Sequence, residues 1–186
     1  MNNIFMVTGV SGSGKDFIIN KLKPCIPRDF SIFNFGQELF KDIRGNNSLV
    51  GNSDSLKNLD YEIINQSLIA VAERVVQSQP VIVNTHVVYI NRGDLIFTPE
   101  INYLLQPLIY IHITAPVVDV FDRRLDSCRS RPTESITRIK LHQDTSIFIT
   151  RRIAKELGAE FINIWNRKGN VNSNIKILSN TLRKYL

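Results

Sequence analysis

The chain has 186 residues, of which 43% are hydrophobic and 22% charged, and 23 Lys and Arg residues stand against 17 Asp and Glu. This composition excludes collagen-like, coiled-coil and largely disordered chains. The net charge of +6 predicts an anionic partner, which leaves nucleic acid, a membrane surface and phosphorylated small molecules open. Because the length suits one hydrophobic core, we expect one domain over residues 1–186.

Targeting and redox signals are sparse in the sequence. No apolar run approaches the roughly 20 residues that span a bilayer, and the first residues carry neither a basic segment nor a small-residue cleavage site. We therefore expect a cytoplasmic protein without a membrane segment. Cys25 and Cys128 belong to no metal-binding motif, so we expect two free thiols.

The first expected elements are a strand, a glycine-rich loop and a helix. The apolar run at residues 4–8 stops at Gly9, and residues 15–22 carry apolar side chains at helical spacing. The next expected elements are a strand at residues 30–35, a helix through residues 38–43 and a loop rich in Asn, Ser and Gly at residues 45–58.

Apolar runs then alternate with segments of helical spacing. Uninterrupted runs of this kind are typical of parallel strands that are covered on both faces. The alternation predicts right-handed βαβ crossovers, and hence a three-layer α/β/α fold with a central five-stranded parallel sheet. The remaining strands are expected at residues 80–85, 108–114 and 161–165, and the helices at residues 59–76, 117–125, 136–157 and 175–185.

The most specific motif lies between the first strand and the first helix. It reads Gly-Val-Ser-Gly-Ser-Gly-Lys-Asp at residues 9–16 and fits the G-x-x-x-x-G-K pattern of a P-loop in its usual context. Glycines let the backbone curl so that N–H groups bind phosphate oxygens, and the lysine adds a charge near the β- and γ-phosphates. We therefore predict a nucleoside triphosphate site that is held by Gly9, Ser11, Gly12, Ser13, Gly14, Lys15 and Asp16.

Two positions depart from the usual pattern for magnesium binding. Asp16 stands where Ser or Thr normally ends the motif, and Asn84 stands at the end of the third strand, where an aspartate is usual. We interpret the pair as an acidic swap, in which Asp16 holds Mg²⁺ directly or through water and Asn84 orients that water. The alternative is a degenerate site that binds nucleotide with little turnover.

Arginines cluster between two of the predicted helices. Guanidinium groups bind phosphate oxygens bidentately and spread the charge that develops during phosphoryl transfer. The cluster predicts an arginine-bearing lid over about residues 126–136, and the alternative is a solvated helical surface that Asp122, Asp126 and Glu134 balance. The arginines are Arg123, Arg124, Arg129, Arg131 and Arg138.

A second ligand requires its own recognition residues. We expect the acceptor region at about residues 36–78, with Phe35, Gly36, Gln37 and His86 as substrate-binding residues. The Gln37 amide is able to read the edge of a base, and simple solvent exposure is the alternative. For His86, a structural contact in a turn is the alternative to a contact with the acceptor.

The other two histidines are expected in structural roles. His112 lies within an apolar strand and is expected to be a hydrogen-bonded core residue. His142 and Gln143 are expected to hold their long helix to the core.

Several short motifs follow the P-loop in a fixed order. They are Phe33-Asn34-Phe35-Gly36, Asn84-Thr85-His86, Arg123-Arg124, Arg129-x-Arg131, His142-Gln143 and Asn166-x-x-Gly169. In this order they resemble the archaeal-type adenylate kinases, which belong to the P-loop nucleoside monophosphate kinases. The resemblance implies that Arg124, Arg129 and Arg131 act with Lys15 as catalytic residues at the phosphates, and that Asn166 and Gly169 lie near the adenine of ATP.

The resemblance also implies the reaction. A chain of this family transfers the γ-phosphate of ATP, with Mg²⁺, to AMP or a similar nucleoside monophosphate and forms ADP. Three alternatives stay open: another phosphorylated acceptor, a nucleotide-binding protein with little turnover, and a nucleic-acid binder that only the charge favours. A P-loop ending in Gly-Lys-Asp is also similar to that of a bacterial kinase for ribose 1,5-bisphosphate. We expect small-molecule partners rather than nucleic acid or membrane, and we leave a homo-oligomer open.

Overall fold

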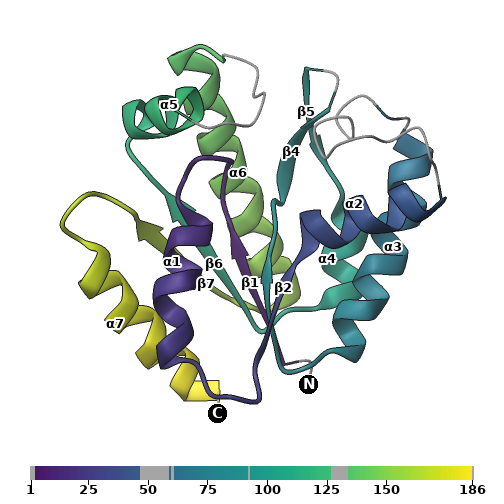
Figure 1. Ribbon diagram of the computed structural model, residues 1–186, viewed down its shortest axis with the longest axis horizontal. Helices are drawn as coiled ribbons and strands as arrows, with labels where there is room; N and C mark the ends of the chain where they lie inside the picture. The colour runs from purple at the N-terminus through teal and green to yellow at the C-terminus, as the bar shows by residue number, and fades with distance from the viewer. Residues whose placement is uncertain (1–2, 47–58, 60, 92, 127–133, 186) are drawn as a thin grey trace.

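The computed structural model describes residues 3–46, 59, 61–91, 93–126 and 134–185. Five strands form one sheet in the order β2-β3-β1-β6-β7, and every neighbouring pair is parallel. This arrangement confirms the predicted α/β fold with a central five-stranded parallel sheet (Figure 1). The strands are β1 (Ile4–Thr8), β2 (Ser31–Asn34), β3 (Val81–Asn84), β6 (Ile109–Thr114) and β7 (Glu160–Trp165).

Helices cover both faces of this sheet (Figure 1). The bounds of α1, α5 and α6 are those that the apolar spacing predicts. The helices are α1 (Lys15–Leu22), α2 (Phe35–Asn46), α3 (Tyr61–Gln77), α4 (Pro99–Leu105), α5 (Val117–Leu125), α6 (Ile136–Leu157) and α7 (Val171–Leu182), with short 3₁₀ turns at Lys23–Cys25 and Arg183–Tyr185. Within the described residues, none of these helices has the length and hydrophobicity of a membrane span.

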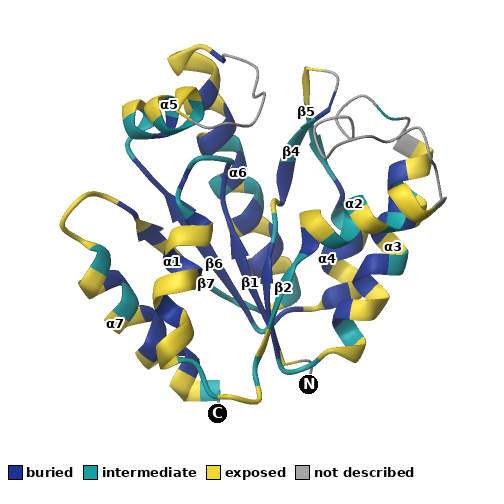
Figure 2. Cartoon of the chain, in the orientation of Figure 1, coloured by how far each residue is buried: buried dark blue, intermediate teal, exposed yellow. Residues whose placement is uncertain are grey.

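Alternate residues of the strands pack into two layers of core. In β1, Ile4 and Met6 join the apolar cluster that contains α3, whereas Phe5 and Val7 join the cluster that contains α1 and α7. Successive side chains of a strand point to opposite faces, so a strand that is apolar throughout stabilises both layers. Figure 2 shows the central strands β1, β3 and β6 buried and the outer faces of the helices exposed.

The carboxyl ends of the central strands bring the polar motifs together. The P-loop follows β1, and the register places Val7 of β1 beside Asn84, the last residue of β3. On the other side of β3, Asn34 ends β2 in register with Asn84. The sheet therefore presents the P-loop, Asn84 and the start of α2 at one edge, where ligands bind in open α/β folds.

After β3 come a hairpin and a short helix that the apolar pattern of the sequence does not predict. The hairpin pairs β4 (Val88–Asn91) with β5 (Asp94–Phe97) in antiparallel register, and α4 begins at Pro99. Gly93 has a φ of 89° in the hairpin turn, a conformation that favours glycine. The hairpin stands above the carboxyl edge of the sheet beside α6 (Figure 1).

The last helix begins earlier than predicted. It starts at Val171 rather than at residue 175 and ends at Leu182. Its first turn carries the polar residues Asn172, Ser173 and Asn174, so apolar spacing alone gives no signal for this turn.

Candidate functional site

The P-loop backbone adopts conformations that only glycine tolerates well. Gly9, Gly12 and Gly14 have φ values of 135°, 89° and 93°. A Cβ atom on Gly14 would lie 2.1 Å from Asn166 Nδ2, and one on Gly9 would lie 2.3 Å from the carbonyl oxygen of Ile113. Both the backbone conformation and the close packing therefore require glycine at these two positions.

Side chains bind the outward-facing carbonyls of this loop. Arg124 Nε donates to Ser11 O at 2.9 Å, Arg123 Nη1 to Gly12 O at 3.2 Å, and Asn166 Nδ2 to Ser13 O at 2.8 Å. The N–H and C=O of a trans peptide point in opposite directions, so the amides of Gly12 and Gly14 face the other side of the loop. The loop therefore has the anion-binding form of a P-loop.

The helix that follows adds further donors. Gly14 is the N-cap of α1 without a side-chain cap, and Ile18 N donates to Gly14 O at 3.0 Å. The first amides of a helix have no partner within the helix and carry the positive end of its dipole. The start of α1 therefore supports phosphate binding beside the loop.

Lys15 lies folded against its own loop. Its side chain is buried, with 7% of the residue exposed, and Nζ donates to Gly9 O at 2.8 Å and to Val10 O at 3.2 Å. The ammonium group therefore lies at the phosphate loop, as the motif predicts. Its hydrogen bonds to carbonyl oxygens are of the kind that phosphate oxygens can replace.

His86, two residues after the end of β3, contacts the same carbonyl. Its Nδ1 lies 2.7 Å from Gly9 O and 3.4 Å from Lys15 Nζ, so Nδ1 carries the proton and donates to the carbonyl. His86 is exposed overall, and its Nδ1 faces Gly9 O and the Lys15 ammonium. Desolvation there, and then the Lys15 ammonium, lower the pKa of His86 well below its usual value. The imidazole is therefore neutral at pH 7.

The two predicted metal-side residues are in contact. Asn84 Nδ2 donates to Asp16 Oδ1 at 2.5 Å. Asp16 lies exposed in the first turn of α1, whereas Asn84 is buried at the end of β3. The described residues contain no cluster of three or more His, Cys, Asp or Glu side chains that would hold a metal alone. A metal bound here would take its remaining ligands from phosphate and water, which suits Mg²⁺.

The predicted arginine cluster is divided in the structure. Arg123 and Arg124 lie on α5 against the P-loop, and Arg124 also pairs with the carboxylate of Glu134. Arg138 lies in the first turn of α6 and donates to Gly93 O at the tip of the hairpin. Arg129 and Arg131, and most of the predicted lid at residues 126–136, lie outside the described residues.

The predicted acceptor residues lie at the start of α2. Phe35 is buried in the apolar cluster that contains α3, whereas Gly36 and Gln37 are exposed. Asn34 Oδ1 accepts from the backbone N–H of Gln37 at 3.2 Å, which fixes the start of the helix. The amide of Gln37 therefore lies open at the carboxyl edge, and its binding role stays a prediction.

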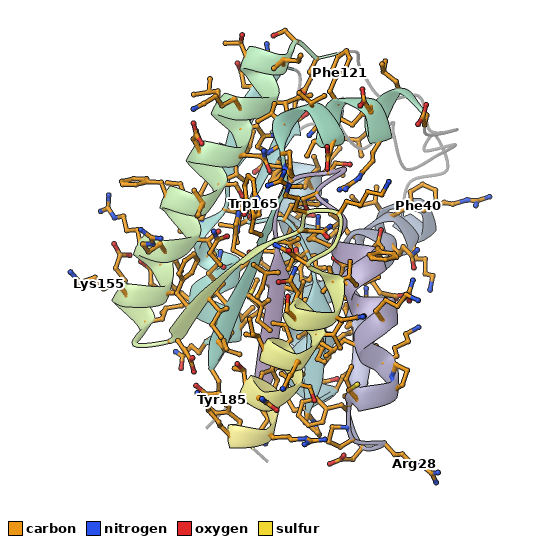
Figure 3. The ribbon with its side chains drawn as sticks, turned by 90° about the vertical axis from the view of Figure 1, so that its left-hand side faces the viewer. Arg28, Phe40, Phe121, Lys155, Trp165 and Tyr185 are labelled. Carbon is orange, nitrogen blue, oxygen red and sulfur yellow. The ribbon has the colours of Figure 1, made fainter. Side chains whose placement is uncertain are left out.

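The β7–α7 connection approaches the P-loop through one residue. Asn166 is 4% exposed and lies directly after Trp165, the last residue of β7. Figure 3 labels Trp165, which lies toward the edge of the sheet where the strands have their carboxyl ends. The same view shows Phe121 of α5 at that end of the molecule and Arg28 and Tyr185 at the opposite end. Gly169 has a φ of 96° in the turn before α7. Contacts of Asn166 and Gly169 with adenine stay a prediction.

The other histidines lie where the sequence predicts structural roles. His112 Nδ1 lies 2.9 Å from Thr8 Oγ1 and 3.3 Å from Thr150 Oγ1 in the core. Desolvation, and then the charge of Lys15, lower the pKa of His112 to about 3. His142 Nε2 lies 3.1 Å from Val88 O and therefore donates to the hairpin.

Sequence reasoning missed how closely Gln143 holds the start of α5. Its Oε1 accepts from the backbone N–H of Ala115 at 3.2 Å, and its Nε2 donates to the carbonyl of the same residue at 3.1 Å. One amide therefore satisfies both backbone groups of Ala115 between β6 and α5. Ala115 also packs with Val10, Val120 and Ile139 in a small buried apolar cluster.

Comparisons with solved structures support the fold. A shikimate kinase from Acinetobacter baumannii in complex with shikimate aligns with a TM-score of 0.64 at 16% identity, over 98% of this chain and 94% of that chain. A deoxyadenosine kinase from M. mycoides aligns with a TM-score of 0.60 at 15% identity, over 97% and 99%. A sugar kinase from Janibacter sp. aligns with a TM-score of 0.54 at 15% identity, over 97% and 94%. At these identities the likeness shows the fold alone, which is that of P-loop kinases.

Sequence comparison gives the family. No curated protein matches the chain significantly. The family model AAA_17, described as an AAA domain, matches residues 8–140, a span that starts just before the P-loop and ends in the first turns of α6. Since this span is well over half of the chain, the protein belongs to the AAA-domain family AAA_17 and has a P-loop kinase fold.

Proposed function

We propose that the protein is an ATP-dependent kinase that transfers the γ-phosphate to AMP or a similar nucleoside monophosphate and forms ADP. The observation that carries the proposal is the P-loop itself, with Lys15 on the loop carbonyls and Asp16 in contact with Asn84 at the carboxyl edge. Phosphoryl transfer depends mainly on the positioning of two ligands and on cations at the transferred group. A P-loop, a buried lysine and a carboxylate at the metal side meet these needs.

Lys15 and the loop amides bind the donor in this proposal. Phosphate oxygens replace Gly9 O and Val10 O as acceptors of the Lys15 ammonium, because a charged acceptor forms the stronger hydrogen bond. The Nδ1–H of His86 remains on Gly9 O and keeps this carbonyl paired after Lys15 turns away. The donor site therefore forms without leaving a buried carbonyl unpaired.

Asp16 and Asn84 fit a bound Mg²⁺. A carboxylate is a hard oxygen ligand, and the amide of Asn84 fixes the orientation of that carboxylate. When bound, the metal neutralises charge on the β- and γ-phosphates. Asp16 thus supplies the acid that this kind of site more often has at position 84.

The acceptor is assigned to the side of α2 and the hairpin. Gln37 is exposed beside Asn34, and His86 reaches the P-loop from the same edge. A neutral imidazole and an amide both offer hydrogen bonds to a nucleotide without adding charge. These groups support recognition of a base or sugar next to the transferred phosphate.

A second candidate is a hydroxyl acceptor instead of a phosphate acceptor. On α2 and α3, Lys41 pairs with Glu38 at 2.6 Å and Arg74 pairs with Asp42 at 2.8 Å, so these two cations already have carboxylate partners. The similar solved structures include a kinase with shikimate and a deoxyadenosine kinase. This candidate predicts phosphorylation of a nucleoside or another small alcohol.

A coupled assay with ATP and Mg²⁺ tests the proposal and separates the two candidates. The acceptor panel contains AMP, other nucleoside monophosphates, nucleosides, shikimate and ribose phosphates. We expect ADP formation to rise with a nucleoside monophosphate. A rise only with nucleosides or shikimate favours the second candidate, and ATP binding without any acceptor-dependent turnover identifies a nucleotide-binding protein instead.

A further inference from the structure

The outer side of the P-loop is held by side chains from two remote parts of the chain. The donors come from α5 and from the residue that follows β7, and Figure 1 shows α5 beside the loop between β1 and α1. Ser11, Gly12 and Ser13 each present a carbonyl to one of these donors. The three donors are Arg124, Arg123 and Asn166, in that order.

The charges of both arginines are already compensated by acids. Arg124 pairs with Glu134, and the two side chains are 8% and 6% exposed. Arg123 Nη2 lies 3.6 Å from Asp119 one turn away on α5. A buried guanidinium with a carboxylate and a backbone carbonyl as partners is stabilised where it is, and moving it to a phosphate would leave Glu134 buried without its partner.

Packing holds the same arrangement. A Cβ atom on Gly12 would lie 3.2 Å from Val120 Cγ1 of α5, and Val10 packs with Val120 and Ile139 in a buried cluster. On the other side, Asn166 Nδ2 lies so close to Gly14 that no Cβ atom fits there. The loop is thus enclosed on its outer side by α5 and by the β7–α7 connection.

We propose that Arg123, Arg124, Glu134 and Asn166 are positioning residues that act on the P-loop backbone rather than on the nucleotide. We call these four residues the outer brace. Glycine-rich segments lose much conformational entropy on ordering, and bonds to the outward carbonyls keep the inward amides aligned before a phosphate arrives. Glu134 contributes by holding Arg124 on Ser11 O. The inference rests on the proposed nucleotide site and gives Arg124 and Asn166 a different role from the one that the sequence resemblance implies.

Asn166 distinguishes a brace from an adenine contact. The probes are Mg²⁺–ATP and Mg²⁺–tripolyphosphate, which lacks the adenine, and titration calorimetry measures the Kd of each. The brace predicts that Asn166→Ala weakens both ligands by a similar factor of about ten, the effect of one lost hydrogen bond on the loop. Asn172→Ala, at an exposed position of α7, is the matched control and leaves both Kd values unchanged. Weaker binding of ATP alone, or no change for either ligand, overturns the assignment of Asn166.

Glu134 gives a test in which the two roles of Arg124 predict opposite signs. If Arg124 acts on the loop, Glu134→Gln loosens it and raises the Kd of ATP by roughly three- to tenfold. If Arg124 instead binds phosphate, Glu134→Gln removes its competitor and lowers that Kd. Glu156→Gln is the matched control, because Glu156 and Arg152 form an exposed ion pair within α6. A lower or unchanged Kd in Glu134→Gln overturns the brace.

Thermal unfolding identifies variants that fail to fold, and ligand binding by the wild type separates a failure of the proposed function from a failure of the brace. A variant enters the comparison only if its unfolding is cooperative, and if Asn166→Ala does not fold, Glu134→Gln and Arg124→Lys decide. Lysine keeps the charge of Arg124 but cannot reach Ser11 O and Glu134 with a planar fork, so the brace predicts weaker ATP binding in Arg124→Lys. If the wild type binds neither probe, the proposed function fails; if it binds them and the variants bind equally well, only the brace fails.

Discussion

The amide Nδ2 of Asn84 donates a hydrogen bond to Asp16 Oδ1 at 2.5 Å, although 68 positions separate the two residues in sequence. The contact joins the first turn of α1, directly after Lys15, to the end of β3. It places one carboxylate at the predicted metal side and gives that carboxylate a neutral partner.

The acidic swap predicts different effects for the two residues. Asp16→Ala removes the carboxylate and is expected to lower Mg²⁺-dependent turnover by at least about tenfold, because a charged ligand is lost. Asn84→Ala removes only the orienting amide and is expected to have a smaller effect. Steady-state kinetics over a range of Mg²⁺ concentrations measures both, and full activity in Asp16→Ala would refute a metal role.

Exchanging the two chemistries is a sharper test of the same pair. Asp16→Ser alone leaves no carboxylate, and Asn84→Asp alone places two carboxylates side by side, so we expect both single variants to lose activity. The double variant restores a hydroxyl at position 16 and an acid at position 84, and it is expected to recover turnover relative to Asp16→Ser. A double variant no better than its worse parent contradicts the swap.

Gln143 is expected to stabilise the fold rather than contact a ligand. Gln143→Leu leaves the buried N–H and C=O of Ala115 without partners, and we expect the free energy of unfolding to fall by about 2–4 kcal/mol. Urea unfolding measures the change, with Gln77→Leu at an exposed position of α3 as the control. Equal stability of Gln143→Leu and wild type would show that these two hydrogen bonds contribute little.

His112 makes stability depend on pH. Its folded pKa of about 3 lies below the ordinary value, so as pH falls from about 6.5 toward 3 the unfolded chain binds a proton that the native state does not. As pH falls through that window, this group therefore lowers the free energy of unfolding by about 1.4 kcal/mol per pH unit. Above the window the group is neutral in both states, so it no longer makes stability depend on pH.

The variant His112→Asn isolates this contribution. It lacks the titrating imidazole, so its stability deficit relative to wild type is expected to shrink as pH falls through the window. Other titrating groups cancel in the difference between the two proteins. Urea unfolding at a series of pH values measures this difference, and a deficit that stays constant with pH contradicts the assignment.

The sheet and the P-loop could be predicted because their signals are local. Runs such as residues 4–8 and 108–114 are apolar without interruption, and the glycines at 9, 12 and 14 mark the loop directly. The hairpin at residues 88–97 was missed because its short strands mix buried and half-exposed positions, although the turn at Gly93 is a usable signal.

Contacts between side chains and remote backbone carry no such signal. Arg124 was predicted at the phosphates, and the structure places its Nε on Ser11 O and its Nη1 on Glu134. Asn166 was predicted near adenine, and its Nδ2 lies on Ser13 O. A donor that binds a carbonyl more than a hundred positions away follows from the packing of α5 and β7 on the loop, which periodicity and motif spacing do not describe.

The central claim is γ-phosphate transfer at the P-loop, and label transfer tests it most directly. ATP labelled in its γ-phosphate is incubated with Mg²⁺ and AMP or another acceptor, and the label in the acceptor is measured for wild type and Lys15→Met. We predict that wild type labels a nucleoside monophosphate and that Lys15→Met, which removes the ammonium but keeps an unbranched side chain, loses nearly all transfer. No label in any acceptor above background, or equal transfer by Lys15→Met, would contradict the account.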